Sequence, residues 1–157
     1  MSRSLAFLLA VTLAGTAGSQ EASRDSSSAV TPERISYVGT GNGWSGGRTE
    51  WSIDRSGRGS YRTTVRIEAE GQFNAGPEGF ARIRAILQPL EGLRELPCDG
   101  AVTDQGTGAL SWQRGDRTSS LRFDFGCNFR QPDAARTWLG RASDLVREWA
   151  LAKGPRG

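Results

Sequence analysis

The amino-acid sequence predicts an α+β fold, an antiparallel sheet of four to five strands with two amphipathic helices packed on one face. Two segments alternate polar and apolar residues as hairpins do, and two others repeat apolar residues at helical spacing. These segments follow one another in ββα-ββα order. Because a sheet with one apolar face needs a cover, the two helices complete a plausible domain.

The first 17 residues have the order of a secretory signal peptide. Arg3 supplies the charged start, residues 5–13 (LAFLLAVTL) form an apolar run, and small residues follow, with cleavage expected after Ala17 or Ser19. The apolar run is half the length of about 20 residues that a membrane-spanning helix needs. We therefore expect a soluble mature protein, periplasmic or extracellular, with no membrane span after cleavage.

The mature chain is predicted to begin with a flexible tether and to continue as one domain. Residues 18–33 are rich in serine and lack any apolar period, which is typical of a flexible segment. Residues 34–153 then have the length of a single domain.

The first strands are predicted between residues 35 and 67. Residues 35–38 (ISYV) form a short strand candidate, and the glycine-rich residues 39–47 end it. Residues 50–54 and 61–67 alternate polar and apolar side chains on either side of a Ser-Gly turn. This pattern predicts a hairpin with one apolar and one charged face.

The first helix is predicted to enter at Pro77 and to end near Pro89. Its apolar stripe consists of Phe80, Ile83, Ile86, Leu87 and Leu90. A second hairpin follows over residues 110–125, turning at residues 114–117. A closing helix opens at Pro132 and carries Ala135, Trp138, Leu139, Ala142, Leu145, Val146 and Trp149 at helical spacing.

The cysteines, Cys98 and Cys127, are the only two in the chain and are predicted to form a disulfide. In an exported protein two cysteines usually pair. The alternative is a reactive thiol, which needs a neighbouring base or a CxxC pair to lower its pKa. Neither feature is visible in the sequence.

The order of elements resembles that of a group of small exported bacterial proteins of unknown function. The residues that carry the resemblance are Trp51-Ser-Ile-Asp54, Gly57, Tyr61, the helix at 80–90, Val102-Thr-Asp104 and the closing helix. It covers residues 34–151 and implies a periplasmic or secreted domain with no known activity. Residues 39–47 stand here in place of the cysteine-containing segment that some of those proteins carry.

Composition excludes several classes of function. The chain has no histidine, which excludes Ser-His-Asp and Cys-His catalysis and histidine-ligated zinc. The net charge is +3, and the basic residues are interspersed with acidic ones, so no basic arm for nucleic acid is present. We expect no cofactor, no metal and no nucleic-acid partner.

Two short motifs match known strings but have simpler explanations. Residues 41–46 fit GxGxxG, yet the chain continues into a strand rather than into the helix that a dinucleotide site needs. Residues 114–116 spell the adhesion tripeptide Arg-Gly-Asp, and they also place Gly-Asp where a hairpin turn favours it.

Carboxylates offer the one enzymatic alternative, a small glycosidase-like enzyme that works with paired acids. Candidate carboxylates are Glu50, Asp54, Glu68, Glu70, Asp99 and Asp104. If the first hairpin closes as predicted, Glu50 and Asp54 lie opposite Arg62 and Arg66, and exposed ion pairs explain them without catalysis.

Trp44 is the candidate binding residue. The other four tryptophans fall on predicted core stripes, whereas Trp44 lies among glycine and serine with no apolar period around it. An aromatic ring in such a loop can stack on a sugar or fill a partner's pocket, or it can fold back onto the sheet edge. We expect a non-enzymatic exported domain that binds a protein or a cell-envelope component; neither the biological role nor the oligomeric state can be predicted.

Overall fold

A computed structural model of the chain describes residues 31–41, 46–96, 98–101, 105–129 and 132–152. The fold is α+β, as the sequence predicts. In chain order the elements are β1 (Arg34–Thr40), β2 (Arg48–Asp54), β3 (Arg58–Thr63), β4 (Ala69–Asn74), α1 (Gly76–Leu87), the 3₁₀ turn η2 (Gln88–Leu90), β5 (Cys98–Ala101), β6 (Thr107–Arg114), β7 (Arg117–Asp124), β8 (Cys127–Phe129) and α2 (Pro132–Leu151).

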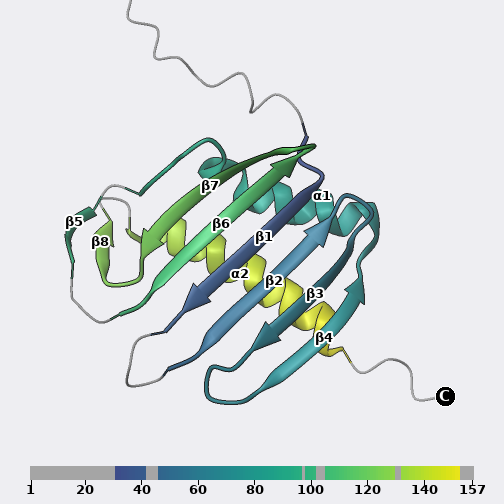
Figure 1. Ribbon diagram of the computed structural model, residues 1–157, viewed down its shortest axis with the longest axis horizontal. Helices are drawn as coiled ribbons and strands as arrows, with labels where there is room; N and C mark the ends of the chain where they lie inside the picture. The colour runs from purple at the N-terminus through teal and green to yellow at the C-terminus, as the bar shows by residue number, and fades with distance from the viewer. Residues whose placement is uncertain (1–30, 42–45, 97, 102–104, 130–131, 153–157) are drawn as a thin grey trace, which may run out of the picture.

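The main sheet has six antiparallel strands in the order β4-β3-β2-β1-β6-β7, more than the four to five predicted. β1 lies at its centre between β2 and β6, and Figure 1 shows the strands side by side. β5 and β8 pair separately as a small second sheet. The predicted ββα-ββα order is therefore corrected: each helix follows four strands rather than two.

The strand expected to run from Tyr61 to Ile67 is shorter than the alternation indicates. β3 ends at Thr63, and Arg66 adopts a left-handed backbone with φ of 63°. Thr63 Oγ1 accepts a hydrogen bond from the Val65 N–H at 3.2 Å, which helps to turn the chain. Ile67 is 71% exposed, and β4 then returns along β3.

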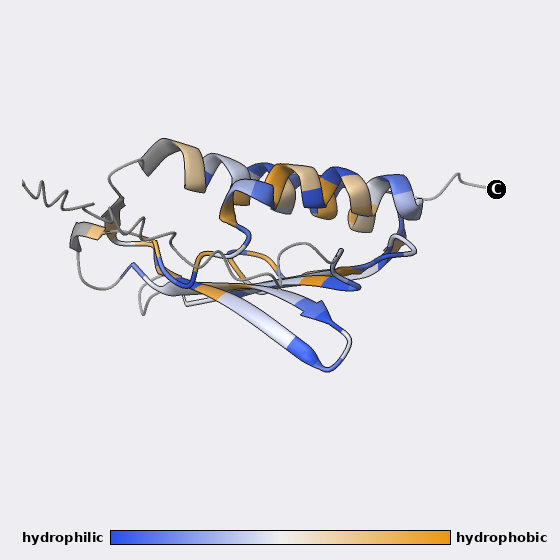
Figure 2. Ribbon diagram, turned by 90° about the horizontal axis from the view of Figure 1, so that it is seen from above, coloured by the Kyte–Doolittle hydropathy of each residue, from blue (hydrophilic) through white to orange (hydrophobic). Residues whose placement is uncertain are grey.

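Both helices cover the same face of the main sheet. In Figure 1 they lie behind the strands, and Figure 2 shows them together above the sheet. α2 packs against β3, β4 and α1. The helical core residues are Phe80, Ile83, Leu87, Leu90, Ala135, Leu139, Ala142 and Val146. Neither helix has the length and apolar composition that crossing a bilayer would require, within the part of the chain described.

The four tryptophans that the structure describes divide into a buried and a half-buried pair. Trp51 and Trp112 are 2% and 1% exposed, and Trp51 Nε1 donates to Ser143 Oγ on α2 at 3.0 Å. Trp138 and Trp149 pack against the core but are only partly buried, contrary to expectation; the Trp149 ring lies against Phe73 of β4, with the ring centroids 5.8 Å apart.

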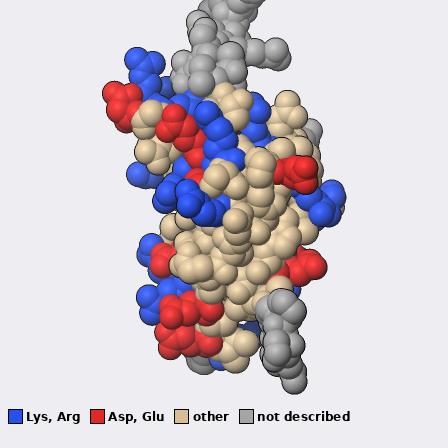
Figure 3. All heavy atoms as spheres, turned by 90° about the vertical axis from the view of Figure 1, so that its right-hand side faces the viewer, with Lys and Arg blue, Asp and Glu red and all other residues tan. Residues whose placement is uncertain are grey.

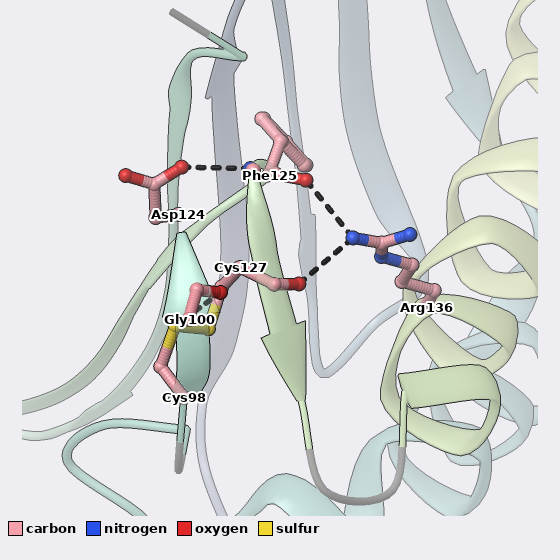
Figure 4. The surroundings of a disulfide bond; sticks show 7 residues. Cys98, Gly100, Asp124, Phe125, Cys127 and Arg136 are labelled. Carbon is pink, nitrogen blue, oxygen red and sulfur yellow. Dashed lines mark hydrogen bonds between the residues drawn. A yellow bond between two sulfur atoms is a disulfide. The ribbon is translucent and has the colours of Figure 1, made fainter. Parts of the chain in front are cut away.

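A disulfide joins Cys98 of β5 to Cys127 of β8, as predicted, with the two Cα atoms 5.5 Å apart. Arg136 of α2 holds this region to the helix: one of its guanidinium nitrogens donates to the carbonyl oxygens of Phe125 and Cys127 at 3.0 and 2.9 Å (Figure 4). Asp124 accepts the Gly126 N–H at 2.7 Å at the same turn. The small sheet is therefore tied both covalently and by hydrogen bonds.

Candidate functional site

The face of the main sheet opposite the helices, here called the open face, is turned toward the viewer in Figure 1. Side chains along a strand alternate between the two faces of a sheet. Ile35 and Tyr37 point into the core, so Ser36 between them points outward; Ser52, between Trp51 and Ile53, does the same. The open face is thus built from the polar half of each alternating strand.

Five serines form a single row across this face. Ser60, Ser52, Ser36, Ser111 and Ser120 are consecutive register partners on β3, β2, β1, β6 and β7. Gln72 of β4 extends this serine row to the sixth strand. Because neighbouring strands lie about 4.8 Å apart, the row spans about 24 Å.

The hydroxyls of the serine row are only partly engaged with one another. Ser111 and Ser120 share a hydrogen bond of 2.9 Å, and Ser52 and Ser60 a longer one of 3.4 Å. The hydroxyl of Ser36, on the central strand, forms no hydrogen bond with any described residue. Hydroxyls both donate and accept hydrogen bonds, so the row presents unsatisfied capacity to solvent.

Ion pairs border the row on the β4 side. Glu70, Arg62 and Glu50 are consecutive register partners, which confirms that Glu50 lies opposite Arg62. The closest ionic partner of Glu50 is nevertheless Arg48 on its own strand at 2.8 Å, while Arg62 lies 3.3 Å from Glu68. These exposed pairs contribute little to stability.

Asp54 does not face Arg66, contrary to prediction, because Arg66 belongs to the turn after β3. Asp54 instead caps the β2–β3 turn: its Oδ1 accepts hydrogen bonds from the Ser56 hydroxyl at 2.5 Å and from the N–H groups of Ser56 and Arg58 at 2.9 and 3.2 Å. The Ser56 hydroxyl above all, followed by the two N–H groups and the Arg58 charge, lowers the pKa of Asp54 below its ordinary value of 3.8.

The open face is hollowed at two places. One hollow of about 590 Å³ is floored by Ser36, Ser52 and Ser60. The other, of about 580 Å³, lies toward β7, where Leu96 and the disulfide approach the sheet. Val38 lines both hollows, so the surface beside the serine row is recessed on both sides of the central strand.

The remaining candidates from the sequence lie elsewhere. Trp44 falls outside the described residues, as does Asp104, and the side chain of Asp99 is not among those described. Arg114 of the Arg-Gly-Asp string is buried against Glu91, and Gly115 turns the β6–β7 hairpin with φ of 59°. The Arg-Gly-Asp string therefore forms a hairpin turn, which confirms the simpler of the two explanations.

Charges of both signs are interspersed on the surface. Figure 3 shows Lys and Arg beside Asp and Glu on one flank of the molecule. In the part of the chain that the structure describes, no three side chains of the types that bind metals come together as ligands.

No model of a known protein family and no curated protein matches this chain. Function has therefore to be inferred from the chemistry of the chain's own surfaces.

Proposed function

We propose that this chain is an exported, non-enzymatic domain that binds a protein or a cell-envelope component through the open face of its sheet. The serine row is the observation that carries the proposal. Strands favour β-branched and aromatic residues, so the stability of the sheet does not explain five aligned serines. Small hydroxyls, by contrast, allow a partner to approach the backbone closely and to form hydrogen bonds.

The ion pairs beside the row support an uncharged polar partner. Arg48 and Arg62 are engaged by carboxylates, and a strongly charged polymer would have to displace these pairs. Peptide backbone and neutral glycan both supply donors and acceptors without net charge. Nucleic acid, which needs an excess of basic groups on one face, fits this surface less well.

A carboxylate-based, glycosidase-like enzyme is the alternative. Such an enzyme needs a general acid whose pKa is raised. The surroundings of Asp54 shift its pKa in the opposite direction, and its hydrogen bonds hold it in a turn. Glu50 lies beside Arg48. These arrangements favour structural carboxylates on a binding domain over a catalytic pair.

Affinity capture tests the proposal. The mature chain would be immobilised and exposed to an extract of the producing cell's envelope, with proteins and glycans identified separately. Ser36→Arg, which places a long side chain in the centre of the serine row, should abolish capture of the partner. Ala81→Arg adds the same side chain to the exposed surface of α1 and serves as the matched control.

The two variants separate the possible results. Capture that survives Ser36→Arg but fails with Ala81→Arg would move the binding surface to the helices and overturn the proposal. Ala81 is exposed, where substitutions usually change stability by less than about 0.5 kcal/mol, whereas Ser36 is half-buried. Melting temperatures of both variants close to that of the wild type therefore exclude misfolding as the cause. Release of sugar or peptide fragments by the mature chain, lost in Asp54→Asn, would favour the enzyme.

A further inference from the structure

A third recess lies on the other face, between α2 and the sheet. In Figure 1, α2 crosses behind the middle of the strands and leaves the lower ends of β1 and β2 without a helix behind them. The space there, here called the aromatic cleft, has a volume of about 410 Å³. Its walls include Tyr37, Tyr61 and Phe123 from the sheet, Phe125 from the turn after β7, and Leu139 and Gly140 from α2. Ligand pockets typically have this size and an apolar, aromatic lining.

Glycines leave room for the cleft and for its rings. A Cβ at position 39 would lie 2.5 Å from Tyr37 Oη and 3.2 Å from the Phe125 ring, so Gly39 permits both rings to lie over β1. On the opposite wall, a Cβ at Gly140 would meet nothing within 4 Å. Gly140 therefore faces open space, although a larger residue would favour the helix more.

The rings of the sheet wall form one aromatic surface. Tyr37 stacks with Trp51 at a centroid distance of 5.6 Å and with Phe123 at 6.4 Å. Phe125 meets Phe123 edge-on at 5.4 Å. A planar ring entering the cleft would find both stacking and edge contacts, the two arrangements that aromatic pairs prefer.

Two tyrosine hydroxyls in the cleft lack protein partners. Tyr37 and Tyr61 are 9% and 6% exposed, and neither hydroxyl forms a hydrogen bond with any described residue. Among the described residues, Trp112 Nε1 is the only fully buried side-chain polar atom without a partner, so the two tyrosine hydroxyl oxygens reach the solvent in the cleft and can bind a ligand there. Burial, reinforced by Tyr61, raises the pKa of Tyr37, so its hydroxyl remains protonated and able to donate at neutral pH.

The charged groups at the rim are already engaged. Asp144 and Arg147 of α2 lie 3.1 Å apart, and Arg136 binds the carbonyl oxygens of Phe125 and Cys127. An ionic ligand buried here would need a counter-charge that these groups do not offer freely. Thr49 and Ser143 also line the cleft, but their hydroxyls are hydrogen-bonded to Thr63 and to Trp51. The polar recognition therefore rests mainly on the two tyrosine hydroxyls.

We propose that the aromatic cleft is a small-molecule site for an uncharged, largely apolar compound that carries a ring and one oxygen acceptor. The ring of the compound lies on the aromatic wall, and its oxygen accepts hydrogen bonds from the hydroxyls of Tyr37 and Tyr61. This site is on the opposite face of the sheet from the serine row and does not depend on the function proposed for the open face.

A matched pair of probes tests the site: 2-acetylnaphthalene, which has a carbonyl oxygen, and 2-ethylnaphthalene, which has nearly the same shape without it. Titration of the mature chain, followed by calorimetry or ligand-detected NMR, should show saturable one-to-one binding with the ketone preferred. Tyr37→Phe and Tyr61→Phe should each weaken ketone binding about three- to tenfold, the range that one net hydrogen bond supplies. Binding of 2-ethylnaphthalene should not change.

Two leucine variants locate the binding. Gly140→Leu fills the cleft from α2 and should abolish binding of both probes, whereas Ala81→Leu on the exposed surface of α1 should affect neither. Far-UV circular dichroism would verify that each variant is folded. Absence of saturable binding to the wild-type chain, equal affinities for the two probes, or binding that survives in folded Gly140→Leu would each overturn the proposal.

Discussion

The same substitution at two buried tryptophans should lower the stability at one and leave it nearly unchanged at the other. Trp51 and Trp112 are both almost fully buried, and both point from the sheet into the core under the helices. Their indole N–H groups differ: Trp51 donates to Ser143 of α2, whereas Nε1 of Trp112 has no hydrogen-bond partner among the residues that the structure describes. Replacing each by phenylalanine removes the same atoms from equally buried sites.

The size of the difference follows from the hydrogen bonds. In both variants the free energy of unfolding falls by a similar amount, because each loses apolar contacts and gains a small cavity. These two costs cancel when the variants are compared with each other. Trp51→Phe also loses a hydrogen bond worth about 0.5–1.5 kcal/mol net, while Trp112→Phe removes an unsatisfied donor whose burial costs about 1–3 kcal/mol. Trp51→Phe should therefore be less stable than Trp112→Phe by about 1.5–4.5 kcal/mol, a large part of the total of about 5–15 kcal/mol that is usual for a domain.

Equilibrium urea unfolding of the mature, disulfide-bonded chain, followed by circular dichroism, measures this difference as a separation of transition midpoints at equal slope. Trp112→Phe should unfold close to wild type and Trp51→Phe clearly earlier. If Trp112→Phe proves as destabilised as Trp51→Phe, the indole N–H of Trp112 has a partner such as a buried water, and the reasoning fails.

Three further changes have defined outcomes. Replacing Cys98 and Cys127 by alanine should lower the free energy of unfolding by about 3–4 kcal/mol in the loop-entropy description, since they lie 29 residues apart; alkylation of both in unreduced wild-type protein would show instead that they are free. The lowered pKa of Asp54 means that the folded state binds a proton at this carboxylate less tightly than the unfolded state does. The ionised carboxylate therefore stabilises the folded protein at neutral pH, and this stabilisation is lost as the pH falls through the acid range below about 4. Asp54→Asn should therefore flatten the acid side of a melting-temperature profile, and an unchanged profile would count against the hydrogen bonds described. Trp44→Ala should leave the melting temperature nearly unchanged and weaken partner binding by at least about 1 kcal/mol; a clear loss of stability would place this ring in the core.

The helices and most of the main strands could be predicted because their patterns are local. Pro77 marks the start of α1, and Pro89 ends it in a 3₁₀ turn. β4 was missed because only Phe73 in it is fully buried, and because Gly71 stands at an inward position. A Cβ at Gly71 would lie 2.2 Å from the Ala150 carbonyl oxygen, so α2 packs too closely to allow any residue but glycine here. The apolar side chain that would have completed the alternating pattern is therefore missing from the sequence.

The candidate sites depend on sheet order, which no local pattern contains. Ser36, Ser52 and Ser111 each occupy a polar position of an alternating strand, and this much is visible in the sequence. They align only because β1 pairs with both β2 and β6. In the same way, alternation predicts that Tyr37 and Tyr61 point inward, but only the path of α2 determines that their hydroxyls meet open space.

Site-specific photo-crosslinking tests the binding function of the open face most directly. A benzophenone amino acid would replace Ser52 in the serine row or, as the control, exposed Ala85 on α1, and both proteins would be irradiated in the producing cells. The account predicts a discrete crosslinked product from position 52 and none from position 85. A product from position 85 alone would contradict the assignment of the open face as the binding surface.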